Sequence, residues 1–192
     1  MNVSKSALRR QMRNKRRSLS QQQQTQASIR LKTTLFSNLR YRKSQRIALY
    51  LANDGEVSTQ KIIDHCWQQN VDVYLPVLNP LKKGHLLFVH YQPDSIMRTN
   101  RYGIKEPDPK YNQHISARYL NLVLMPLVAF DDQGNRLGMG GGFYDRSFEF
   151  CRPDKQNSGL KPELVGLAHQ CQRAEQLPTE AWDIPLDKII AV

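Results

Sequence analysis

This sequence of 192 residues lacks long hydrophobic runs, a regular cysteine pattern and any acidic residue in its first quarter. Its longest apolar run, residues 122–130, contains Pro126 and falls far short of the ~18 residues that a membrane helix needs. No apolar segment follows the basic amino terminus, which argues against a secretory signal. Three widely spaced cysteines, Cys66, Cys151 and Cys171, form neither a disulfide framework nor a metal-binding CxxC pair. These absences predict a cytoplasmic protein with reduced thiols and no membrane segment.

The lack of carboxylates before Asp54 concentrates positive charge at one end. Residues 1–53 hold 13 Lys and Arg, whereas the remaining chain holds 15 basic and 17 acidic residues, so the excess of +11 lies in the first quarter. Three interpretations stay open: a solvated helical face, an arm on nucleic acid, and an anion site served by one or two of these cations. A mitochondrial presequence is a fourth. Leu8 and Met12 count against it, because residues four apart can pack on a core.

Capping residues and hydrophobic periodicity predict alternating helices and strands. Helices are expected over residues 5–17, capped by Ser4, over 21–39, capped by Ser20, after Ser58, and from about residue 144. Strands are expected over residues 47–51, 71–77, 86–91, 120–125, 164–168 and 188–191. The order strand–helix–strand over residues 47–77 predicts a parallel pair, and residues 92–117 are expected to be irregular. The sequence therefore predicts an α/β fold: a single three-layer domain over residues 1–192, with a largely parallel sheet and helices on both faces.

Four glycines surround Met139 within residues 138–142, after a buried strand and before a helix. Glycine permits positive φ and close approach of the backbone to a ligand. Successive N–H groups that end at a helix N-terminus attract anions. Arg136 and Arg146 add cationic donors, and Asp145 is either a ligand for a hard metal ion or a helix-capping carboxylate. The segment therefore indicates a phosphate-binding loop.

Familiar phosphate motifs do not fit this loop, because the sequence has no Gly-Lys pair and Phe143 stands where a dinucleotide fingerprint needs glycine. Instead, RLGMGGGFYDR at residues 136–146 resembles the signature of the 5-formyltetrahydrofolate cyclo-ligases, also called 5,10-methenyltetrahydrofolate synthetases. Other stretches agree in order: KSALR at 5–9, YLANDGEVST at 50–59, VYLP at 73–76, YGIKEP at 102–107 and WDIP at 182–185. The resemblance spans nearly the whole chain and disfavours a presequence.

The resemblance implies ATP-dependent cyclisation of 5-formyltetrahydrofolate to 5,10-methenyltetrahydrofolate with Mg²⁺, by a monomer that binds ATP and a reduced folate. It implies Arg136 and Lys5 as the catalytic cations. ATP contacts are implied for Lys5, Ser6, Ala7, Leu8, Arg9, Arg136, Leu137, Gly138, Met139, Gly140, Gly141, Gly142, Phe143 and Tyr144. Folate contacts are implied for Leu51, Glu56, Tyr102, Met139, Gly140, Gly141, Gly142 and Phe143. Metal ligands are implied at Asp145 and Asp183.

Two other functions are weighed against this one. The charge of residues 1–53 raises nucleic-acid binding, but the sequence lacks the aromatic-rich strand of an RNA-recognition module. Another phosphate-handling enzyme, such as a sugar-phosphate isomerase on a similar sheet, would also use a glycine loop with flanking arginines. The five histidines carry no motif, and no nucleophilic triad is evident.

Overall fold

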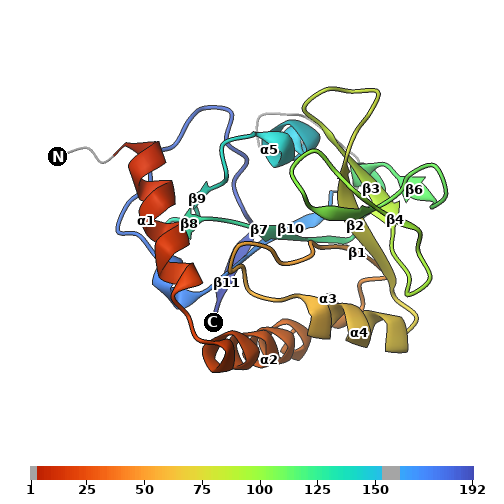
Figure 1. Ribbon diagram of the computed structural model, residues 1–192, viewed down its shortest axis with the longest axis horizontal. Coiled ribbons are helices and arrows are strands. Elements are labelled where there is room, and N and C mark those ends of the chain that lie inside the picture. The colour runs from red at the N-terminus through yellow and green to blue at the C-terminus, as the bar shows by residue number, and fades with distance from the viewer. Residues whose placement is uncertain (1–3, 153–160) are drawn as a thin grey trace.

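The computed structural model describes residues 4–152 and 161–192. Seven strands form one sheet (Figure 1), and their spatial order is β11 (Lys188–Ala191), β10 (Glu163–Ala168), β7 (Leu122–Pro126), β1 (Arg46–Ala48), β2 (Asp72–Leu78), β3 (Leu86–His90) and β6 (His114–Ile115). The strands from β11 to β2 are parallel, and β3 and β6 continue the sheet antiparallel. Two hairpins lie apart from it: β4 (Met97–Thr99) with β5 (Lys105–Pro107), and β8 (Ala129–Phe130) with β9 (Arg136–Leu137).

Helices cover both faces of this sheet (Figure 1). They are α1 (Lys5–Arg17), α2 (Gln21–Ser37), α3 (Leu39–Arg42), α4 (Gln60–Gln68) and α5 (Phe143–Ser147), with 3₁₀ turns η1 (Ala117–Tyr119), η2 (Glu149–Cys151) and η3 (Gln170–Gln172). The helices α2 and α4 lie along one face, and the short α5 and η2 lie on the other. The expected α/β fold with a mostly parallel sheet is confirmed. Among the described residues, no helix is both long enough and apolar enough to cross a membrane.

The strand β7 shows why its sequence is continuously apolar. Leu122 and Leu124 pack with α2 and α4, whereas Val123 and Met125 pack on the opposite face with Phe148. Successive side chains of a strand point to opposite faces, so a strand covered on both sides needs apolar residues at every position.

The first helix packs at the end of the sheet and not along either face (Figure 1). Ser4 caps it by accepting a hydrogen bond from the N–H of Ala7, as expected. Leu8 and Met12 are buried against a small cluster that includes Leu137 and Leu177. Their spacing of four residues therefore places one apolar stripe of α1 on the core, as the sequence predicts.

Several predicted boundaries need correction. The strand expected over residues 47–51 ends at Ala48, because the Tyr50 carbonyl accepts from the Thr59 hydroxyl instead of pairing with a neighbouring strand. Thr59, not Ser58, occupies the N-cap of α4. Its hydroxyl is used in the bond to Tyr50, so it makes no side-chain cap. The helix expected over residues 21–39 ends at Ser37, because Asn38 caps α3.

Residues 92–117, expected to be irregular, contain the β4–β5 hairpin and β6. The hairpin closes around Glu106, which is 3% exposed and accepts hydrogen bonds from Arg98 and Asn100. A charged residue at the centre of a three-residue strand gives no hydrophobic pattern, so periodicity does not reveal it.

The packing of α2 predicts a contrast between two of its residues. Leu31 is fully buried, so Leu31→Ala should lower the free energy of unfolding by about 2–5 kcal/mol. Ile29 lies on the same helix and is 48% exposed, so Ile29→Ala should change it by less than about 0.5 kcal/mol. Urea unfolding followed by circular dichroism measures both. Equal losses would mean that α2 does not pack on the sheet as described.

Candidate active site

A cleft of about 1050 Å³ opens at the carboxyl ends of β1 and β7. Its walls are the inner side of α1, the loop after β1, the glycine loop before α5, the β4–β5 hairpin and the turn at residues 180–183. Loops beyond the carboxyl ends of parallel strands are the usual ligand-binding place in such sheets. The fold thus brings together segments that lie far apart in the sequence.

Most of the residues singled out in the sequence line this cleft. They are Lys5, Arg9, Leu51, Glu56, Tyr102, every residue from Arg136 to Asp145, and Asp183. The exceptions are Ser6, Ala7, Leu8 and Arg146, which do not line it. Arg146 is instead used to bind backbone carbonyls of Gly84 and Gly141. Leu8 belongs to the core cluster under α1. A five-residue match on a helix includes residues from all its faces, whereas only Lys5 and Arg9, four apart, face the cleft together.

The cleft face of α1 carries a stripe of cations at Lys5, Arg9, Arg13 and Arg16. Lys5 Nζ lies 3.0 Å from a carboxylate oxygen of Glu180, and Arg9 Nε donates to the carbonyl of Gly138 at 2.8 Å. The stripe follows from the spacing of the basic residues, which recur every three or four positions. Part of the surplus charge of the first quarter therefore lies along the cleft.

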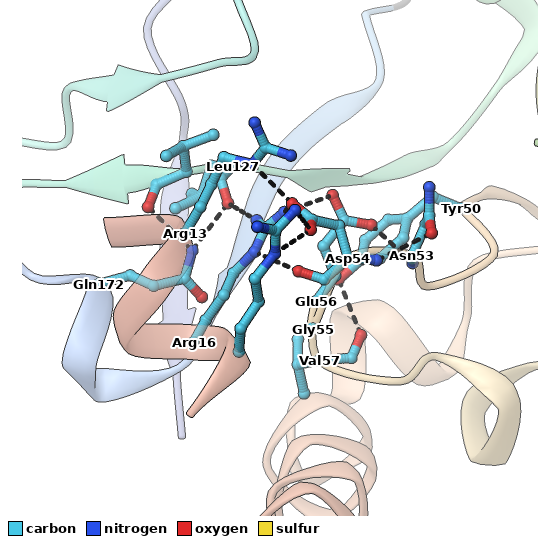
Figure 2. A network of polar contacts seen from close by, with 12 residues as sticks. Arg13, Arg16, Tyr50, Asn53, Asp54, Gly55, Glu56, Val57, Leu127 and Gln172 are labelled. Carbon is cyan, nitrogen blue, oxygen red and sulfur yellow. Dashed lines mark hydrogen bonds and ion pairs between the residues drawn. The ribbon is translucent and has the colours of Figure 1, made fainter. Parts of the chain in front are cut away.

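Arg16 is the most buried member of this stripe, with 1% exposure (Figure 2). Its Nε donates to the backbone carbonyl of Asp54 at 2.8 Å, and Nη2 lies 2.9 Å from Asp54 Oδ2. Its Nη1 donates to the carbonyl of Leu127 at 3.2 Å, just beyond β7. Arg13 and Arg17 also pair with Asp54. The open interpretation of a solvated basic face therefore does not describe Arg16, whereas the side chain of Arg17 is 50% exposed.

The surroundings shift the pKa values of two carboxylates in the loop after β1 in opposite directions. Burial alone would raise the pKa of Asp54, but hydrogen bonds from the three arginines outweigh it and lower this pKa to about 2. Burial raises the pKa of Glu56, against the opposing effects of a hydrogen bond from the Asn53 N–H and of the Arg16 charge. Asp54 is thus firmly ionised, and Glu56 is the carboxylate that titrates more easily.

The glycine loop is anchored by two arginines. Arg9 binds the carbonyl of Gly138, and Arg146 binds the carbonyls of Gly141 and Gly84. Gly140 has a φ of +94°, and a Cβ there would come within 3.3 Å of the Arg9 guanidinium. At this position the backbone conformation favours glycine, and a larger residue would also displace the Arg9 guanidinium by a few tenths of an ångström.

Arg136 and Asp145 form an ion pair at the wall of the cleft. Arg136 Nη2 lies 2.5 Å from Asp145 Oδ1, and Nη1 donates to the carbonyl of Ile184. The same Asp145 oxygen accepts from the N–H of Ile184 at 3.2 Å. The side chain of Arg136 is only 7% exposed. The arginine implied as a catalytic cation is therefore packed and oriented by a carboxylate.

Large apolar side chains are exposed around the mouth of the cleft. Tyr102 and Met139 are each 56% exposed, and Trp182 is 60% exposed. Tyr102 meets Phe143 edge-on, with ring centroids 6.3 Å apart. Exposed aromatic surface at a polar cleft favours a ligand that has a flat ring system.

Periodicity and motif reasoning missed Asp54, Glu180 and Trp182 as cleft residues. Asp54 carried a usable signal, because it is the first acidic residue after 13 basic ones and follows a predicted strand. Glu180 has no such signal, since its contact with Lys5 joins positions 175 residues apart. Trp182 appears only as the first residue of a short matching stretch.

The described residues contain no group of three or more His, Cys, Asp or Glu side chains placed to hold a metal ion. Asp145 and Asp183 line the same cleft, but each already accepts hydrogen bonds, Asp183 from the N–H of Glu180 at 2.8 Å. A cation bound here would need oxygen ligands from outside the protein, as Mg²⁺ usually takes from water and phosphate.

Comparison with known proteins agrees with the cleft and the glycine loop. The model of the 5-formyltetrahydrofolate cyclo-ligase family matches residues 1–192. The 5-formyltetrahydrofolate cyclo-ligase of Haemophilus influenzae is 45% identical over 183 residues, 95% of this chain and 95% of its own length. The enzyme of the same name from Escherichia coli K12 is 40% identical over 179 residues, 93% of this chain and 95% of its own.

Solved structures share the fold. The 5,10-methenyltetrahydrofolate synthetase of Aquifex aeolicus superposes with a TM-score of 0.79 at 29% identity, covering 98% of this chain and 90% of its own. That of Mycoplasma pneumoniae has a TM-score of 0.71 at 22% identity, covering 98% of each chain, and supports the fold alone. From its whole-length match, its relatives and its architecture, the chain belongs to the 5-formyltetrahydrofolate cyclo-ligase family.

Proposed function

We propose that this protein cyclises 5-formyltetrahydrofolate to 5,10-methenyltetrahydrofolate and converts ATP to ADP and phosphate. The single observation that carries the proposal is that one cleft is lined both by cations suited to phosphate and by a half-buried carboxylate suited to a pterin. The two reactants can therefore be held side by side, which is what group transfer between them requires.

The chemistry needs activation of a poor electrophile. A formyl group on N5 is amide-like, so its oxygen first receives the γ-phosphoryl group of ATP and ADP leaves. N10 then attacks the activated carbon and loses its proton, and departure of phosphate leaves the methenyl bridge. The protein's task is to align the two substrates and to balance the charge of the transferring phosphoryl group.

Lys5, Arg9 and Arg136 are the cations that we assign to the phosphate end. Lys5 and Arg9 extend from one face of α1, and Arg136 is oriented by Asp145 at 2.5 Å. A preformed orientation matters because donors that are already fixed need no reorganisation as charge develops in the transition state. The N–H groups of the glycine loop can add further donors.

Asp145 and Asp183 are the carboxylates that would hold Mg²⁺. Their oxygens suit a hard cation that takes one or two protein carboxylates and completes its shell with water and substrate phosphate. When bound, this ion supplies positive charge to phosphate oxygens. Asp145 then serves two partners, since it also orients Arg136.

Glu56 is the group that we assign to the folate end. Its carboxylate lines the cleft and can accept hydrogen bonds from the amino and ring N–H groups of a pterin. Leu51, Tyr102 and the glycine loop supply the apolar and backbone surface around it.

The activity itself is the first prediction. Incubation with 5-formyltetrahydrofolate, ATP and a magnesium salt should produce the absorbance of methenyltetrahydrofolate, with one ADP formed per product. Omission of ATP should abolish the signal. Absence of product at every ATP concentration would refute the proposal.

Arg136→Gln is expected to lower kcat about a hundredfold, the usual cost of losing one preorganised donor to a transition state. The KM for ATP should rise, and binding of the reduced folate without ATP should change little. Arg173→Gln is the control, because Arg173 forms an exposed pair with Asp132 outside the cleft lining and its replacement makes the same change of charge. Steady-state kinetics of the two variants decides the point. Kinetics of Arg136→Gln equal to those of the control would remove Arg136 from the mechanism.

A further inference from the structure

Arg16 has no direct part in the proposed chemistry, yet it is the most completely buried charge of the site. Arg16 is 1% exposed, so protein atoms cover its side chain almost completely although the residue lies at the wall of the cleft. Placing an ionised side chain in such a position costs several kcal/mol unless its hydrogen bonds are fully met. The hydrogen bonds of the Arg16 guanidinium therefore explain how this charge can be buried.

The partners of Arg16 come from two segments that meet at the carboxyl end of the sheet, the loop after β1 and the chain just beyond β7. Nε and Nη2 bind the backbone carbonyl and the carboxylate of Asp54, and Nη1 binds the carbonyl of Leu127 (Figure 2). Nη2 also lies 3.7 Å from Glu56 Oε1. The planar fork of arginine can address several acceptors at once, which a lysine ammonium cannot do at the same places.

Glu56 is positioned from both of its oxygens. Oε2 accepts from the N–H of Asn53 at 3.0 Å, and Oε1 faces the Arg16 guanidinium. The loop that carries both residues is itself tight, because a Cβ on Gly55 would lie 3.1 Å from the Arg16 carbonyl. The position of the Glu56 carboxylate thus depends directly on how α1 is docked.

The charge balance around Glu56 depends on the same arginine. The other charged or titratable groups that act on it are Arg13 on α1, Asp54 on its own loop, Tyr50 beyond β1 and Tyr144 on α5. Asp54 raises the pKa of Glu56, and Arg13 and Arg16 lower it, Arg16 by more. Burial alone favours the protonated acid, which would offer a pterin one acceptor fewer.

We propose that Arg16 is a positioning residue for the reduced folate: it holds the carboxylate of Glu56 ionised and directed into the cleft, and does not itself touch substrate. The inference rests on the proposed function, because it takes Glu56 as the acceptor for the pterin. It assigns Arg16 a role separate from that of Lys5 and Arg9, the cations of α1 that we assign to the phosphate end.

The test is calorimetric binding of 5-formyltetrahydrofolate, without ATP, from about pH 5 to pH 9. Removing a positive charge beside an acid raises the pKa of that acid, so the ionised fraction of Glu56 at a given pH falls. In Arg16→Met, the midpoint of the loss of affinity on acidification should move up by about one pH unit. That shift corresponds to about tenfold weaker binding below the midpoint.

Arg10→Met is the matched control, because Arg10 lies on the same helix, is exposed and does not line the cleft. It removes the same charge and should leave affinity and midpoint unchanged. A midpoint in Arg16→Met equal to that of Arg10→Met would overturn the inference, whatever the change in thermal stability.

Two further variants separate positioning from a general loss of structure. Arg16→Lys keeps the charge but loses the fork, so its midpoint should stay near that of the parent while affinity falls several-fold. This variant decides the matter if Arg16→Met does not fold, and unchanged affinity in it would contradict the proposal. In a Glu56→Gln background, Arg16→Met should have no further effect on folate affinity, because the group through which it acts is gone.

Failure of this inference is distinguishable from failure of the proposed function. If the parent binds the folate and forms product, but Arg16 variants behave like Arg10→Met, then only the role of Arg16 is wrong. If the parent binds no reduced folate at any pH, the proposed function fails, and the inference falls with it.

Discussion

A buried guanidinium joins the first helix to the open end of the sheet, and this helix forms one wall of the cleft. Arg16 joins α1 to the loop after β1 and to the end of β7, and Asp54 gathers two further arginines of the helix to the same point. Removing one partner from such a buried pair typically costs about 3–5 kcal/mol, since the other charge is left without compensation. Without this docking, Lys5 and Arg9 would have no fixed relation to the glycine loop.

The cations of α1 fall into two groups that have different roles. Lys5 and Arg9 stand where α1 passes the glycine loop, whereas Arg13, Arg16 and Arg17 are engaged by Asp54. Position along one helix therefore decides whether a cation is available to a ligand or committed to the fold. Two neighbouring carboxylates differ in the same way. Asp54 pairs with three arginines of α1, whereas Glu56 is the carboxylate that we assign to a ligand.

Most of the fold could be predicted from sequence because its strands are covered on both faces. The continuous apolar pattern of β7 and the caps of α1 and α2 are local signals that survive in the structure. The β4–β5 hairpin could not be predicted this way, because a buried Glu106 and not an apolar stripe holds it together. The glycine loop was visible as a motif, whereas the contacts that orient its neighbours, Arg136 with Asp145 and Lys5 with Glu180, were not. Such contacts join distant positions, and no local pattern encodes them.

The docking of α1 also bears on the order in which the chain can fold. The helix lies far from these partners in the sequence: Arg16 reaches Leu127 across 111 positions, and Lys5 reaches Glu180 across 175. Contacts of such long range form late, because the entropy of closing a large loop is lost before the contacts stabilise it. The docking of this positively charged helix on the sheet is therefore expected to be a late step of folding. The cleft wall combines residues of α1 with residues 180–183, so it is complete only after these long-range contacts have formed.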